Sequence, residues 1–200
     1  MKRLLTATLL ILSFVGTGSS QIVWKSDKAH SAAKFTVSHM VIAEVEGYFK
    51  DFDATMTATK DDFTDAKIEA TLQTASISTN NERRDNHLRS DDFLNAEKFP
   101  AITFKSTSVE KTGEDTYKIT GDLTIRDVTK QVVLDTKYNG QVTDPMGNVK
   151  CGFRATTTID RFDYGVKWNR AIETGGLIAG KDVHITLLLE FGKQKEPVHG

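Results

Sequence analysis

Alternation of apolar and polar side chains is the feature that most constrains the fold of this chain. Between residues 66 and 72 every second residue is apolar, and the residues between them are polar. A period of two places successive side chains on opposite faces of a β-strand, so this segment is predicted to bury one face. The apolar faces of this and similar segments are Ala66, Ile68, Ala70 and Leu72; Tyr117, Ile119, Gly121, Leu123 and Ile125; Cys151, Phe153, Ala155 and Ile159; Val183, Ile185, Leu187, Leu189 and Phe191; and, over a shorter stretch, Phe35, Val37 and His39.

Polar clusters with turn-forming residues separate these strands. Residues 60–62, 111–115 and 144–148 are rich in Asp, Gly, Asn or Pro, which favour turns. The pair Asn139-Gly140 is typical of a tight hairpin. The lengths of the flanking segments instead favour a bulge within one long strand. We therefore expect roughly eight antiparallel strands, a pattern that fits either a sandwich or a closed barrel.

One segment interrupts the alternation. Residues 81–94 are rich in charges and helix formers, which predicts a helix that ends before Phe99-Pro100, with a second short turn from Asp91. Arg84 and Asp85 lie beside His87 in this helix. We interpret the Arg-Asp pair as a hydrogen-bonding lock of the helix onto the sheet rather than as catalytic machinery.

The amino-terminal residues resemble a cleavable signal peptide. Lys2 and Arg3 precede an apolar run over residues 4–15, and small residues occupy 18–20. We therefore predict a signal peptide over residues 1–20, a single β-barrel or sandwich domain over residues 21–200, and export of the mature protein.

Composition and motif spacing argue against several functions. Lys and Arg total 26 against 27 Asp and Glu, a balance that gives no reason to expect a nucleic-acid partner. Cys151 is the single cysteine, so it is expected to be a small buried apolar residue. His30, His39 and His87 show no metal-binding spacing, and we predict no metal, required cofactor or catalytic residue.

The predicted inner faces mix large apolar residues with small ones. Ala33, Ala70, Gly121 and Ala155 stand among larger side chains. Small residues inside a small barrel leave room for a guest molecule. A packed barrel with a tapered interior explains the same mixture, so this observation leaves both interpretations open.

The order of several short motifs resembles the YceI-like family of exported polyisoprenoid-binding proteins. The motifs are DKAHS (27–31), FTVSHM (35–40), GYF (47–49), SIST (76–79), RDNHLRSDDFL (84–94), FPAITF (99–104), GDLTIRDVTK (121–130) and RFDYG (161–165). The resemblance implies a lipocalin-like, antiparallel, eight-stranded β-barrel with a short helix near one end. It also implies a periplasmic location and a long polyisoprenoid, of the quinone or prenyl-phenol type, held in the barrel. Asp127 stands where glycine is expected, and an aspartate tolerates such a turn.

Strand parity then predicts the residues of a lipid site. The predicted tail lining is Phe35, Val37, Phe49, Phe52, Met56, Ile68, Leu72, Phe104, Ile119, Leu123, Phe153 and Leu187. The residues predicted to meet the head group or to line the mouth are His39, Phe162, Tyr164 and Trp168.

The predicted function is lipid binding for transport, storage or sensing, without enzymatic activity. One alternative is a stress-related interaction module with a packed barrel, whose loop 164–181 contacts a membrane redox partner. A weaker alternative is an enzyme that acts on an isoprenoid head group with His39 or His87 as the base. A homodimer and a transient contact with a membrane are further expectations that the sequence leaves open.

Overall fold

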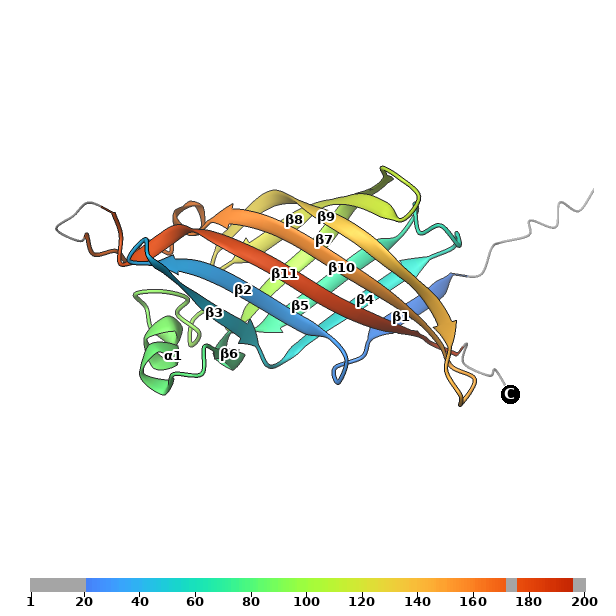
Figure 1. Ribbon diagram of the computed structural model, residues 1–200, viewed down its shortest axis with the longest axis horizontal. Helices are drawn as coiled ribbons and strands as arrows, with labels where there is room; N and C mark the ends of the chain where they lie inside the picture. Colours follow the sequence, from blue (N-terminus) through green and yellow to red (C-terminus); the bar gives the residue numbers. More distant parts are fainter. Residues whose placement is uncertain (1–20, 172–175, 196–200) are drawn as a thin grey trace, which may run out of the picture.

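The computed structural model describes residues 21–171 and 176–195, which form one β-barrel with a short helix (Figure 1). The predicted signal peptide, residues 1–20, lies outside these residues. The strands are β1 Ile22–Ser26, β2 Ala32–His39, β3 Ala43–Phe49, β4 Phe52–Ala58, β5 Lys67–Gln73, β6 Ile77–Ser78, β7 Ala101–Lys111, β8 Thr116–Ile125, β9 Val128–Thr143, β10 Val149–Asp160 and β11 Ala179–Lys193. The helix α1 is Glu82–Arg89, and two 3-10 turns are η1 Thr74–Ser76 and η2 Arg161–Tyr164. Within the described residues, no helix has the length and apolar character needed to cross a membrane.

Eight of the strands close into a ring. The order is β1-β4-β5-β7-β8-β9-β10-β11, and β11 pairs back to β1. Every pairing in this ring is antiparallel. Closure removes the exposed edges that a sandwich would keep. The prediction of an all-β, eight-stranded antiparallel barrel with one short helix is therefore confirmed, and the sandwich is not formed.

The long strand β11 has two partners, one after the other. Its carboxyl end pairs with β1, and its earlier part pairs with β2. The strands β2, β3 and β6 thereby extend the wall beyond β1 and β4. The junction is held by Ser31, whose Oγ accepts the backbone N–H of Glu190 at 3.0 Å. Lys150 Nζ also lies 2.8 Å from an Asp27 carboxylate oxygen and 3.1 Å from one of Glu190.

This ion cluster makes part of the stability dependent on pH. The hydrogen bond from Lys150 holds the pKa of Asp27 well below its usual range. A carboxyl whose pKa is lowered in the folded state stabilises the fold fully above its unfolded pKa of about 4 and loses that effect as the pH falls. We expect Asp27→Asn to cost about 1 kcal/mol at pH 7 because the ions are partly exposed. Urea unfolding at pH 7 and pH 3 checks this: the difference from the wild type should shrink at pH 3, and a constant difference would contradict the assignment.

The predicted turns and the predicted bulge are both found. The segments 60–62, 111–115 and 144–148 connect consecutive antiparallel strands. The strand β9 runs through Asn139-Gly140 without a hairpin. Its register with β10 shifts there, since Gly152 faces Gly140 and Phe153 faces Tyr138. Gly140 has a φ of 106°, a backbone conformation that side chains other than glycine rarely adopt.

The helix is shorter than predicted. Asn81 caps its start, and Ser90 closes its end by donating its Oγ–H to the His87 carbonyl at 2.7 Å. The helix therefore ends at Arg89, and residues 91–94 form only the expected turn. The predicted lock is present, because Arg84 Nε donates to Thr79 Oγ1 at 2.7 Å. Asp85 accepts the Thr79 backbone N–H at 2.8 Å, so both side chains hold the residue that follows β6.

Candidate functional site

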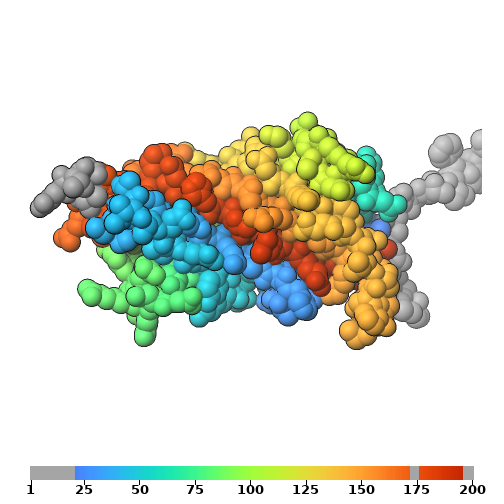
Figure 2. Space-filling model, in the orientation of Figure 1, coloured from blue at the N-terminus to red at the C-terminus, as the bar shows by residue number. Residues whose placement is uncertain are grey.

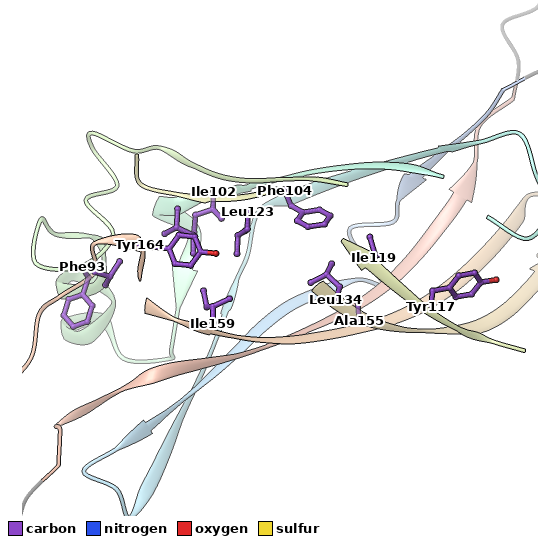
Figure 3. Packing of buried hydrophobic residues seen from close by; sticks show 12 residues of the cluster. Phe93, Ile102, Phe104, Tyr117, Ile119, Leu123, Leu134, Ala155, Ile159 and Tyr164 are labelled. Carbon is purple, nitrogen blue, oxygen red and sulfur yellow. The ribbon is translucent and has the colours of Figure 1, made fainter. Parts of the chain in front are cut away.

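A cavity of about 390 Å³ occupies the barrel interior. Almost all of its walls are apolar side chains, which come from the strands β2 to β11 and from the segments around α1. Figure 3 shows such side chains spread along the barrel, from Phe93 beside α1 to Tyr117 near the other end. The barrel is therefore not filled by its own side chains, which favours the guest-molecule interpretation of the sequence over the packed barrel.

Aromatic rings close the end of the cavity that lies away from α1. The ring of Phe63 packs edge-on against Trp24 at 6.0 Å and against Phe153 at 5.4 Å between centroids. Phe153 also packs against Phe191 at 6.1 Å and Tyr138 at 5.1 Å. Four of these five side chains are less than a tenth exposed. We call these five residues the aromatic plug.

The opposite end, beside α1, is open. Lining residues there are half-exposed or exposed, namely His39, Val45, Trp168 and Arg84. A small cluster of rings stands at this end, in which His87 lies 4.9 Å from Phe93 and 5.1 Å from Trp168 between centroids. The exposure of these residues places the opening of the cavity between the β2–β3 hairpin and α1.

All twelve residues predicted to line a lipid tail lie on the cavity wall. Their contact with a lipid stays a prediction. Of the four residues predicted for the mouth, His39 and Trp168 lie at the opening, and Tyr164 lies inside, only 2% exposed. Phe162 is not part of the cavity wall, and its ring instead faces the Arg161 guanidinium at 4.6 Å.

The small residues divide into two groups. Ala33, Ala70 and Ala155 line the cavity, as the guest-molecule interpretation requires. Gly121 does not leave room for a guest, because a Cβ there would lie 2.4 Å from the ring of Phe104. This glycine accommodates a neighbouring aromatic ring and so differs from the prediction.

Among the polar side chains of the wall, Arg161 and Tyr164 are buried. Tyr164 projects into the barrel interior (Figure 3), and burial raises its pKa to about 12, so its hydroxyl stays neutral. Arg161 is only 6% exposed, and its pKa is lowered by burial. Its guanidinium donates to the carbonyls of Val166 at 2.7 Å, Trp168 at 2.8 Å, Ala179 at 2.9 Å and Gly180 at 2.8 Å. Arg161 opens the RFDYG motif, but a sequence pattern does not reveal its role, because its four partners are backbone atoms.

Arg161 forms no ion pair with a carboxylate among the described residues, and the Asp160 carboxylate offsets its charge only in part. The nearest acid in sequence, Asp160, pairs with Lys181 at 3.0 Å. A buried guanidinium that is bonded to neutral carbonyls leaves a positive potential at the cavity wall. This potential and the Tyr164 hydroxyl favour a guest whose polar end accepts hydrogen bonds.

Cys151 and the cluster of Asp27, His30 and Glu190 lie outside the cavity wall, whereas His87 lines its open end. Cys151 is 2% exposed, and burial raises its pKa to about 12, so it is the small buried residue that was predicted. His87 Nε2 lies 2.8 Å from Asp92. The side chains of Asp27, His30 and Glu190 converge outside the cavity, where Lys150 already supplies a cation between the two carboxylates.

Comparison with known proteins agrees with this architecture. Residues 24–191 match the model of the YceI-like domain. A UPF0312 protein of Staphylococcus aureus is 40% identical over 166 residues, which cover 82% of this chain and 94% of that protein. The chain belongs to the YceI-like family. The family match thus runs from Trp24 in β1 to Phe191 in β11.

Solved structures of YceI-like and related proteins share the fold. A YceI protein of Campylobacter jejuni is 33% identical with a TM-score of 0.68, over 80% of this chain and 90% of that one. BcnA of Burkholderia cenocepacia is 22% identical with a TM-score of 0.72, over 82% and 98%. A polyisoprenoid binding domain from Saccharophagus degradans is 12% identical with a TM-score of 0.63, over 86% and 98%, and its likeness concerns the fold alone.

Proposed function

We propose that this YceI-like protein binds a long polyisoprenoid lipid and carries it across an aqueous compartment. The observation that carries the proposal is the apolar cavity, which is closed at the aromatic plug and open beside α1. An apolar cavity that is closed at one end and open at the other suits a linear hydrocarbon tail that carries a polar group at one end. The binding of a polyisoprenoid by a domain of the same fold supports this choice of ligand.

The energetics favour reversible carriage over irreversible capture. Each methylene transferred from water to the cavity contributes about 0.8 kcal/mol. A bilayer offers the tail a similar environment, so this term nearly cancels between membrane and protein. The distribution of the lipid between membrane and protein then depends on packing against the cavity wall and on hydrogen bonds to the head group. Such a balance lets the lipid leave the protein at a membrane.

The head group is proposed to be a hydrogen-bond acceptor, such as a quinone carbonyl. Tyr164 offers a neutral hydroxyl at the cavity wall, and Arg161 adds a positive potential behind it. We further propose that the protein acts in the periplasm as a binding protein, since the expected signal peptide would export it. Both proposals concern the same site and need no catalytic step.

Mass spectrometry of an organic extract tests the function directly. The protein is purified from the periplasm without detergent, and its folding is checked by circular dichroism before extraction. A single isoprenoid species in stoichiometric amount is the expected result, and it would name the ligand. A clean extract from folded protein that also takes up no ubiquinone from liposomes would overturn the proposal.

A further inference from the structure

The loop between β2 and β3 carries three consecutive exposed apolar side chains. Met40 is 40% exposed, Val41 is 68% exposed and Ile42 is 87% exposed. The loop is short, because His39 and Ala43 already pair across the hairpin. We call residues 40–42 the apolar tip. Among the residues that the structure describes, other large apolar residues that are well exposed, such as Met146, do not stand in such a run.

The backbone of the apolar tip makes its composition more informative. Met40 has a φ of 52° and Val41 has a φ of 67°, both in the left-handed region. Glycine, asparagine and aspartate are the residues that normally occupy such positions, and a β-branched valine is an outlier there. A loop that met only water would be more stable with polar residues. The exposed apolar surface therefore points to an apolar environment for the tip, and the strained backbone marks the loop as a candidate functional segment.

The apolar tip stands at the rim of the cavity opening. The Met40 backbone N–H donates to the carbonyl of Ile178 at 3.0 Å. Ile178 and His39, on either side of that bond, both line the cavity. Figure 2 shows the hairpin, in blue, at the same end of the molecule as α1, in green, whereas the gold turn 144–148 lies at the other end. A surface that contacts the apolar tip therefore also faces the cavity opening.

We propose that the apolar tip inserts into a lipid bilayer surface and so sets the cavity opening against the membrane. This inference rests on the proposed function, because a ligand that resides in a bilayer must pass between bilayer and opening. A protruding loop with a few apolar side chains is suited to the boundary between head groups and acyl chains. The surface area of three side chains is far smaller than the roughly 800 Å² per partner that a stable dimer buries. The tip is therefore poorly suited to bind a second copy of the chain.

Charged residues beside the tip suit an anionic membrane surface. The backbone N–H of Ile178 donates to the carbonyl of Arg170 at 2.9 Å, which brings this exposed cationic residue to the rim. Lys167 is also exposed in the same segment. Glu44 on β3 opposes them in part. We therefore expect anionic lipids to strengthen a contact that the apolar tip provides.

A pair of matched substitutions tests the insertion. Ile42→Asp places a charge in the tip, and Met146→Asp does the same at an equally exposed apolar residue, 82% against 87%, at the other end of the molecule. Both positions are exposed, so both variants should fold, which thermal unfolding checks. In flotation with phosphatidylcholine vesicles, with and without phosphatidylglycerol, Ile42→Asp should partition about tenfold less than the wild type. Met146→Asp should match the wild type.

Each result decides between the proposals. Equal partition of all three proteins, or equal losses in both variants, would overturn the tip proposal. Loss of self-association in Ile42→Asp, seen by analytical ultracentrifugation without vesicles, would assign the tip to contact between copies instead. Uptake of a short-tailed ubiquinone from solution should be unchanged in Ile42→Asp, while uptake from vesicles slows. Vesicle binding without uptake of any ubiquinone would uphold the tip and overturn the proposed function.

Discussion

The substitution Ala155→Phe is expected to reduce the binding of a long-tailed ubiquinone about tenfold or more and to spare a short-tailed one. Ala155 lines the cavity on β10, two residues from Phe153 of the aromatic plug, and is 3% exposed. A benzyl group there would fill the deep end of the cavity and shorten it. Each methylene forced back into water costs about 0.8 kcal/mol, so excluding two of them lowers the affinity roughly tenfold.

The neighbouring outward position provides the control. Thr156 does not line the cavity, since alternate residues of β10 point away from the interior. Thr156→Phe should therefore leave the affinity for both ubiquinones unchanged. Thermal unfolding of both variants separates a filled cavity from a damaged fold. An Ala155→Phe protein that is stable and binds the long-tailed ubiquinone as tightly as the wild type would show that the tail does not reach this depth.

The substitution Arg161→Met is expected to lower the free energy of unfolding by about 3–5 kcal/mol. The guanidinium joins the carbonyls of Val166 and Trp168 to those of Ala179 and Gly180 at the start of β11. Methionine fills a similar volume but leaves four carbonyls without their donor, and unsatisfied buried polar groups are costly. Urea unfolding measures the loss directly.

Two further variants define what Arg161 contributes. Arg161→Lys should recover only a small part of the loss, because one ammonium group cannot reproduce the planar arrangement of guanidinium donors. Arg154→Met removes an exposed arginine from β10, the strand that leads into Arg161, and should change the stability by no more than about 0.5 kcal/mol. Equal effects of Arg154→Met and Arg161→Met would refute the structural role of the buried guanidinium.

The barrel and the cavity wall were predictable because they depend on a local rule. Side chains in a strand alternate between two faces, so parity alone placed Phe35, Leu123 and Leu187 on the interior face. The same rule does not reveal how neighbouring strands share space. Gly121 had the parity of a cavity residue, yet the ring of Phe104 from the adjacent strand covers it.

The residues at the open end were harder to predict, because regular strands stop there. Phe162 and Tyr164 belong to the 3-10 turn η2, in which three residues complete a turn. Side chains two positions apart therefore point in different directions, which places Tyr164 inside the barrel and Phe162 against Arg161. The apolar tip was not predictable for another reason. Three apolar residues that follow a strand are recognised as exposed only when the position of the hairpin is known.

The aromatic plug has a consequence for the order of events in lipid delivery. A lipid that enters a cavity closed at one end must leave through the same opening by which it entered. The same end of the barrel would then have to face the donor and, afterwards, the acceptor membrane. One molecule could not connect the two at once, so delivery would require release, rotation and a second encounter, and its rate would depend on diffusion across the gap.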